Sequence, residues 1–172
     1  CNSGIANTCN ADGVEKARGM CEITAKALGI APTDVIVAST GVIGQPLDLS
    51  PVEQGMPQLI GELSKAGSDH AAQAIMTTDT RKKEFALTFM LGGKGCTIGA
   101  ISKGSGMIHP NMATMLCFIT TDVAISTPML QKALSAAVAD SFNMLSIDGD
   151  TSTNDLACIL AVSYTHLTLP TT

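Results

Sequence analysis

One stretch of the chain, residues 103–116, combines residue types that can carry out acyl chemistry. Its sequence is KGSGMIHPNMATML, in which glycines allow unusual backbone conformations and a proline fixes φ. Thr114 begins an apolar, β-branched run that would hold its hydroxyl rigidly. If the bond before Thr114 were cut, its free α-amine, with a pKa of about 8, would suit a general base at neutral pH. The alternative from the residues alone is a glycine turn that leads into an ordinary strand.

Composition narrows the class of protein. The chain has 172 residues, of which 45% are hydrophobic, and a formal net charge of −5. That length suffices for one domain with its own core. A negative charge, one Tyr and no Trp argue against a surface that binds nucleic acid.

The cysteines and the hydropathy pattern indicate a compartment. Six cysteines are present without a C-x-x-C pair, so neither a zinc site nor a thioredoxin-type motif is supported, and we expect no metal. Cysteines within apolar segments usually behave as small hydrophobic residues in a reducing environment. No apolar run approaches the roughly 18 residues of a membrane helix. We therefore expect a soluble, cytoplasmic protein with no membrane association.

Two other polar groups invite a site assignment that we reject. His109 could act as a base, but Pro110 biases it toward an extended conformation, and the Thr114 amine already supplies a base. Residues 148–155, DGDTSTND, imitate the alternating ligands of a calcium loop. Such a loop needs Gly at its sixth position and a carboxylate at its twelfth, where this chain has Thr153 and Ile159. We expect residues 148–155 to hold turns around the site.

Five runs of sequence, in order, carry a resemblance to one known family. They are NSGIAN at 2–7, ASTGVIG at 38–44, IMTTDT at 75–80, the 103–116 stretch, and DGDTSTND at 148–155. With these runs the chain resembles the self-cleaving glutamate N-acetyltransferase / ornithine acetyltransferase family of arginine biosynthesis. The likeness extends over residues 1–161. Five ordered runs are much more specific than any one of them.

The resemblance implies a self-processing enzyme. Cleavage would fall between Ala113 and Thr114, and Thr114 would become the first residue of a second subunit and the catalytic nucleophile. The acetyl group of N-acetylornithine would pass to the Thr114 hydroxyl and from there to glutamate, which splits one difficult amide exchange into two steps. Acetyl-CoA as a co-substrate stays open, no other cofactor is expected, and the family implies a heterotetramer of two cleaved subunit pairs.

The resemblance also assigns further site residues. Thr40 and Gly41 would form the oxyanion hole, although a strand-end turn that merely requires Gly is the alternative. Thr77, Lys103 and Thr114 itself would contact substrate. Lys103 suits a substrate carboxylate, whereas a solvent-exposed lysine is the more common situation. Because Thr78 is chemically equivalent to Thr77, the choice between them stays open.

Two rival functions remain. One is a self-cleaving aminopeptidase or amidohydrolase with a Thr nucleophile, which would hydrolyse the acyl-enzyme. The other is an inactive, truncated domain, because the family has substrate contacts nearer its C-terminus that find no counterpart here. The absence of an initiating Met points to an internal piece of a longer protein, with residues 1–161 as a partial acetyltransferase domain. Residues 162–172 resemble no part of the family and read as a non-native tail from translated sequencing-adapter DNA.

The elements that must position these residues follow from periodicity and punctuation. Apolar spacing predicts a helix over 12–28 that stops at Gly29, a strand over 35–38, and a helix over 50–63 with Ser50 as N-cap. A shorter helix is expected over 69–76 and a helix from 127 that turns an apolar stripe inward: Leu130, Leu134, Ala137, Val138 and Phe142. Strands are expected over 85–90, 96–102, 114–121 and 153–162. The fold class is therefore α/β (α+β), and the resemblance implies a layered αββα-type sandwich similar to N-terminal-nucleophile hydrolases.

Overall fold

The computed structural model describes residues 1–109 and 115–162. The chain divides into two compact units, Cys1–Thr77 and Thr78 onward, which are described separately. Among the described residues, no helix is both long and apolar enough to cross a membrane.

The first unit is built from helices. They are α1 (Gly13–Leu28), the short 3-10 helix η1 (Pro32–Asp34), α2 (Ser50–Gly61) and α3 (Ser68–Ala74). The predicted helix over 12–28 is confirmed by α1, which ends at Gly29 with a φ of 69° and a hydrogen bond from the Gly29 N–H to the Ala25 carbonyl. Glycine adopts this left-handed conformation without the steric cost that other residues incur.

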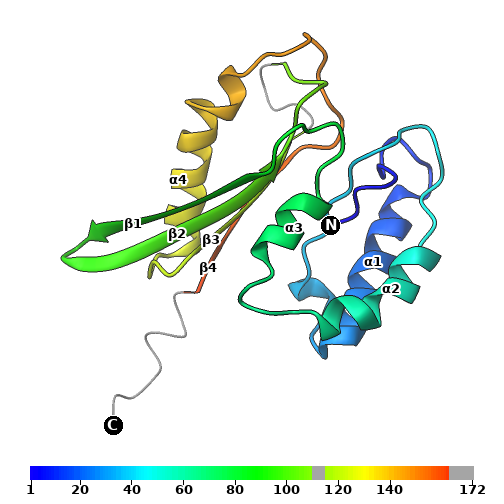
Figure 1. Ribbon diagram of the computed structural model, residues 1–172, viewed down its shortest axis with the longest axis horizontal. Coiled ribbons are helices and arrows are strands. Elements are labelled where there is room, and N and C mark those ends of the chain that lie inside the picture. The colour runs from blue at the N-terminus through cyan, green and yellow to red at the C-terminus, as the bar shows by residue number, and fades with distance from the viewer. Residues whose placement is uncertain (110–114, 163–172) are drawn as a thin grey trace. The chain divides into compact units, whose positions relative to one another are not determined.

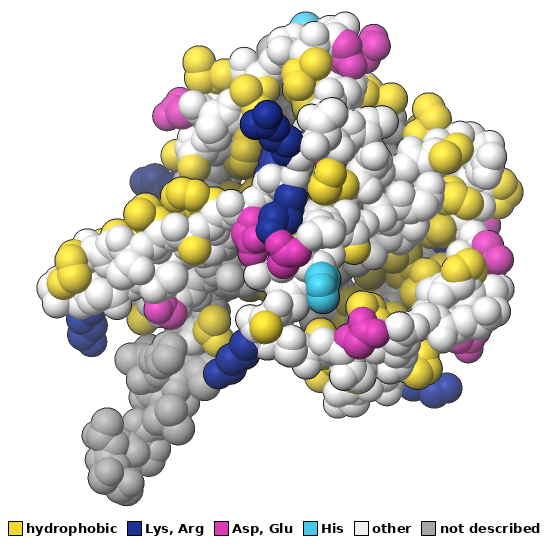
Figure 2. Space-filling model, in the orientation of Figure 1, with side chains coloured by type: hydrophobic (Ala, Val, Ile, Leu, Met, Phe, Trp, Pro, Cys, Tyr) yellow, Lys and Arg dark blue, Asp and Glu magenta, His cyan; other side chains and the backbone are white. Residues whose placement is uncertain are grey.

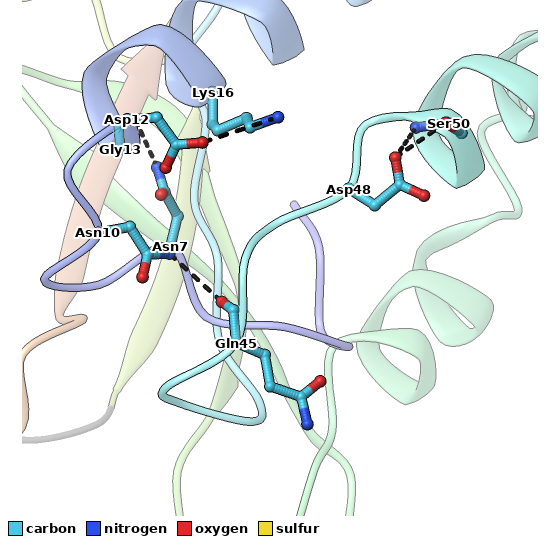
Figure 3. Close-up of polar contacts among 8 residues, drawn as sticks. All are labelled: Asn7, Asn10, Asp12, Gly13, Lys16, Gln45, Asp48 and Ser50. Atoms are coloured by element: carbon cyan, nitrogen blue, oxygen red, sulfur yellow. Dashed lines mark hydrogen bonds and ion pairs between the residues drawn. The ribbon is translucent and has the colours of Figure 1, made fainter.

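The start of α2 differs from the predicted capping box. Leu49 occupies the N-cap position, and no side chain caps the helix from there. The Asp48 carboxylate instead accepts hydrogen bonds from the Ser50 backbone N–H (2.9 Å) and the Ser50 hydroxyl (2.8 Å) (Figure 3). A carboxylate near a helix N-terminus also suits the helix dipole. The predicted Ser50 N-cap is therefore wrong by one position.

The predicted strand over 35–38 is also wrong. These residues lie in irregular structure, and Ile36 is exposed. Parallel pairing begins at the end of this segment, where isolated bridges join Asn2 to Ser39 and Ile5 to Val42. A short apolar run does not reveal which segment it will pair with. The pattern therefore located an extended segment, but the residues that pair, Ser39 and Val42, follow it.

The second unit contains one four-stranded sheet with the strand order β1-β2-β3-β4. The strands are β1 (Lys83–Leu91), β2 (Lys94–Lys103), β3 (Leu116–Thr121) and β4 (Leu156–Ala161). β1 and β2 form an antiparallel hairpin, β2 and β3 are antiparallel, and β3 and β4 are parallel. The hairpin turns at Gly92 and Gly93, whose φ values of 57° and 77° fit a tight two-residue turn.

Helix α4 (Thr127–Ala139) connects β3 to β4, as a parallel pair requires, and the 3-10 helix η2 (Phe142–Met144) follows it. α4 lies along one face of the sheet (Figure 1). Leu130, Leu134 and Val138 of the predicted apolar stripe are partly buried, but Ala137 is exposed. The stripe is thus one position narrower than expected.

The mixed α/β class is confirmed. The described residues form a single sheet covered by α4 on one face, which corresponds to part of a layered sandwich. β3 begins at Leu116 rather than at the predicted Thr114, and Thr114 lies outside the described residues. Cys117 in β3 is buried, and this burial raises the pKa of its thiol to about 11, in keeping with an inert, hydrophobic role.

Candidate active site

In the first unit, two of the five sequence runs pair with each other. Asn2 accepts a hydrogen bond at its carbonyl from the Thr40 N–H (2.9 Å), and Gly4 accepts one from the Val42 N–H (3.0 Å). The Asn2 side chain orders the first run, because its Oδ1 accepts from the Gly4 N–H and its Nδ2 donates to the Ile5 carbonyl. The turn that contains Thr40 is therefore held by residues far from it in sequence.

Gly41 is packed against the backbone of the first run. Its φ is 116°, and a Cβ at this position would lie 2.3 Å from the Gly4 carbonyl oxygen. Only glycine fits both the conformation and the space. Among the described residues, the Gly41 N–H has no hydrogen-bond partner. It is therefore available as a donor, and its role in an oxyanion hole stays a prediction.

Thr40 is 2% exposed. Because its N–H is already donated to Asn2, an oxyanion donor at Thr40 has to be its hydroxyl. A hydroxyl and the next N–H along the chain would then form the two-donor arrangement that stabilises a tetrahedral intermediate.

Further hydrogen bonds connect the first run to the helices. The Ser3 hydroxyl donates to the Ala74 carbonyl at the end of α3 (2.7 Å). The Asn7 backbone N–H donates to the Ser39 hydroxyl oxygen, and the Asn7 side-chain amide donates to the Gly13 carbonyl at the start of α1. In Figure 3, Asn7 and Gly13 lie together beside the Asp12–Lys16 ion pair. These bonds fix the segment against which Gly41 packs.

The choice between Thr77 and Thr78 as the substrate contact stays open. Both residues are exposed, and Thr77 is the last residue of the first unit. Thr78 belongs to the second unit, where its hydroxyl is hydrogen-bonded to the Ser105 hydroxyl at 2.7 Å. Thr77 as the substrate contact stays a prediction, with Thr78 as the alternative.

In the second unit, the other runs meet at one end of the sheet. The register places Lys103 of β2 opposite Leu116 of β3, and Leu116 opposite Leu156 of β4. β1 starts at this same end, since Lys83 pairs with Ser102. The last residue of β2 and the segments that precede β3 and β4 therefore converge.

Lys103 lies at the centre of this sheet end with a side chain that is 2% exposed. Burial lowers its pKa from the usual 10.5, while the carboxylates of Asp79 and Asp155 act in the opposite direction. Binding of a substrate carboxylate by Lys103 stays a prediction. The alternative of a solvent-exposed lysine is wrong.

Asp79 organises the neighbourhood of Lys103. Its buried carboxylate pairs with the Lys83 ammonium at 2.5 Å and accepts a hydrogen bond from the Gly104 N–H at 2.8 Å. The Lys83 ammonium also donates to the Gly104 carbonyl at 3.0 Å. The backbone immediately after Lys103 is thus held on both sides.

Residues 148–155 hold the other side of the sheet end. Asp148 accepts hydrogen bonds from the Met107 and Ile108 N–H groups, and Asp155 accepts one from the Met115 N–H at 2.9 Å. The expectation that this run forms turns around the site is consistent with these contacts. His109 lies 3.4 Å from the Ser146 hydroxyl through its Nδ1, which suits the structural role expected for it.

Comparison with known proteins finds one family. The ArgJ family model matches residues 1–169. The chain belongs to the ArgJ family. An arginine biosynthesis bifunctional protein ArgJ 1 of Clostridium acetobutylicum is 56% identical over 161 residues, which are 93% of this chain and 40% of that protein. A counterpart ArgJ from Symbiobacterium thermophilum is 52% identical over the same share of each chain.

A solved ArgJ structure supports the fold. The crystal structure of the arginine biosynthesis bifunctional protein argJ from Bacillus halodurans matches with a TM-score of 0.57 and 37% identity. The match covers 66% of this chain and 59% of that one. The chain spans about two fifths of the length of the curated ArgJ relatives named above.

Only part of the predicted site lies within the residues that the structure describes. Thr40 and Gly41 lie together in the first unit, and Lys103 lies in the second. The cleavage site between Ala113 and Thr114 falls outside the described residues. Sequence analysis missed the role of Asp79 and Asp155, although both lie within the runs that carry the resemblance.

Proposed function

We propose that the full-length protein is a self-processing acyltransferase that moves an acetyl group from N-acetylornithine to glutamate through an acetyl-Thr114 intermediate. Membership of the ArgJ family, with relatives named for arginine biosynthesis at 56% and 52% identity, carries this proposal. The close packing at Gly41 and the buried Lys103 support it, because both suit the roles that the family pattern implies.

The first step is cleavage of the chain. The Thr114 hydroxyl attacks the Ala113 carbonyl carbon, the peptide C–N bond breaks, and the Thr114 nitrogen takes the hydroxyl proton. Water then hydrolyses the resulting ester, which releases the Ala113 carboxylate and restores the hydroxyl. Thr114 now carries a free α-amine, the general base for the later reaction.

Transfer then takes place in two displacements. The Thr114 hydroxyl attacks the acetyl carbonyl of N-acetylornithine, and ornithine leaves with the proton that the α-amine passes to it. The glutamate amine attacks the acetyl-Thr114 ester, which gives N-acetylglutamate and the free hydroxyl. The Thr40 hydroxyl and the Gly41 N–H stabilise the tetrahedral oxyanion, and losing one such donor typically costs roughly 10²–10³ in rate.

Other features of the enzyme are proposed from the family resemblance. Lys103 and Thr77 bind the substrate, acetyl-CoA serves as an alternative acetyl donor to glutamate, and two cleaved subunit pairs form a heterotetramer. The protein works in the cytoplasm without a metal.

The decisive experiment is a denatured intact mass of the full-length protein beside a Thr114→Ala variant. We expect two pieces with a break between Ala113 and Thr114 in the wild type and one whole chain in the variant. Thr88→Ala, in exposed strand β1, is the matched control and should be cut normally. A single uncut chain in all three proteins would overturn the mechanism.

A second assay separates the transferase from its rivals. The cleaved enzyme should convert N-acetylornithine and glutamate to ornithine and N-acetylglutamate. Release of free acetate or of peptide fragments instead would favour a hydrolase. Comparing the 172-residue chain with the full-length protein tests the inactive-domain alternative, since binding of N-acetylornithine by the shorter chain would contradict it.

A further inference from the structure

Residues 148–155 form a loop that presents a carboxylate at each end to the backbone of another segment. At the first end, Asp148 uses both oxygens: Oδ2 accepts from the Met107 N–H at 2.5 Å and Oδ1 from the Ile108 N–H at 2.9 Å. The neighbouring Ile147 N–H donates to the Ile108 carbonyl at 2.8 Å. Both backbone groups of Ile108 are therefore bound to residues 147–148.

The other end of the loop holds Met115 in the same way. Asp155 Oδ1 accepts from the Met115 N–H at 2.9 Å, and the Leu156 N–H donates to the Met115 carbonyl at 2.9 Å. Met115 is 8% exposed, so these hydrogen bonds are shielded from water. The lower local dielectric strengthens them. Met115 directly follows Thr114 in the chain.

Backbone strain marks the first attachment. Met107 has a φ of 58°, in the left-handed region that residues other than glycine rarely adopt. Such a conformation costs free energy and persists only where the surroundings impose it. The hydrogen bond from the Met107 N–H to Asp148 is one contact that does so.

From these contacts we infer that Asp148 and Asp155 are positioning residues for self-cleavage, holding the backbone on both sides of the Ala113–Thr114 bond. The inference rests on the proposed function. Neither carboxylate is assigned a contact with the reacting atoms, and neither exchanges a proton in the reaction. Asp148 fixes the backbone of Met107 and Ile108, and Asp155 fixes that of Met115, which directly follows Thr114 in the chain. A displacement of about 1 Å in a reacting group can cost roughly 10² in rate.

The test uses the full-length protein and the rate of cleavage, followed by intact mass from the first appearance of the precursor. Asp155→Ala should slow cleavage roughly ten- to a hundredfold. Asp155→Asn should restore most of the rate, because its amide oxygen still accepts from the Met115 N–H. The cleavage rate of Asp148→Asn should lie between those of wild type and Asp148→Ala, because an amide has one acceptor oxygen where Asp148 uses two.

A matched control and a rescue separate positioning from general damage. Asp150 is an exposed carboxylate in the same loop, and Asp150→Ala should cleave at the wild-type rate. Adding Met107→Gly to Asp148→Ala should recover part of the lost rate, because glycine adopts the φ of 58° without strain. Far-UV circular dichroism establishes that each variant is folded, and the rescue keeps the test valid if Asp148→Ala folds poorly.

Each outcome bears on the inference. Wild-type rates in both folded alanine variants would overturn it, as would an Asp155→Asn rate as low as that of Asp155→Ala, which would assign the effect to charge. Cleavage of the wild-type protein together with slow cleavage of the alanine variants would support the inference. A wild-type protein that is not cleaved at all would instead overturn the proposed function, and the inference with it.

Discussion

Gly41 illustrates how one residue can be required for two independent reasons. Its φ of 116° disfavours any side chain, and the Gly4 carbonyl oxygen lies where a Cβ would be placed. Gly44 shares only the first property, since its φ is 77° and nothing lies within 4 Å of its Cβ position. The two glycines therefore form a matched pair for mutation.

We expect Gly41→Ala to destabilise the chain by more than Gly44→Ala. The backbone conformation alone costs about 1–3 kcal/mol, and only Gly41→Ala adds a clash with the first run. Thermal unfolding of both variants measures the difference, and acetyl transfer by the full-length protein should be lost in Gly41→Ala. Equal melting temperatures in the two variants would contradict the packing argument.

Lys103 is the residue for which burial changes the functional interpretation. Replacing it by methionine keeps much of its volume and removes the charge, so Lys103→Met in the full-length enzyme should raise the KM for the carboxylate substrates. Charged hydrogen bonds are worth roughly 1.5–3 kcal/mol, which corresponds to about ten- to a hundredfold. Lys94→Met, at the exposed start of the same strand, is the control and should leave KM unchanged. An effect on kcat alone would argue against substrate binding.

At the scale of elements, the sheet gathers residues that are far apart in the sequence. The alternation of β1, β2 and β3 and the parallel return of β4 bring Asp79, Lys103, Met115 and Asp155 to one end. The loop that carries Asp148 then attaches to the segment after β2. A site assembled in this way depends on loop contacts that a pH change can weaken.

The Asp148 contacts predict a specific pH dependence. Hydrogen bonds from the Met107 and then the Ile108 N–H lower the pKa of Asp148 below 3.8. Ionised Asp148 therefore stabilises the folded state above about pH 3.8, and this stabilisation is lost as the pH falls through the folded-state pKa of Asp148. We expect the melting temperature of wild type to exceed that of Asp148→Asn at about pH 6 and the difference to shrink below about pH 4. A difference that stays constant with pH would contradict this assignment.

The predictability of the elements varied with the kind of signal. Helix α1 was predicted closely because its apolar period and Gly29 are local. The Ser50 cap failed because the carboxylate that binds the start of α2 belongs to Asp48, just outside the pattern. The strand over 35–38 failed because pairing depends on a partner, and the partner here is the run that begins at Asn2.

At the scale of the whole chain, strand β1 exposes apolar side chains on one face. Phe85 is 61% exposed and Leu87 is 50% exposed, and the two lie two positions apart on the same side of the strand. Figure 2 shows hydrophobic side chains at the surface of the β1–β2 hairpin. Exposed apolar patches of this kind favour association, and an edge strand adds unpaired backbone groups.

We therefore expect the 172-residue chain to associate as its concentration rises. Phe85→Thr combined with Leu87→Thr should reduce association, because both substitutions remove apolar surface while keeping strand propensity. Thr88→Ser, on the opposite face, is the control. Light scattering after size-exclusion chromatography measures the mass, and an unchanged mass in the double variant would rule out this face as the cause.

By itself the sequence determined the α/β class, the family and the identity of most candidate residues, because ordered runs and local periodicity are written along the chain. The tertiary structure decided which of those residues act together. Asp79 and Asp155 gained a role only when strand register brought them beside Lys103, and Gly41 became irreplaceable only when the Asn2 run packed against it. The physical reason is that burial, pKa shifts and close contacts depend on neighbours distant in sequence, which no local pattern records.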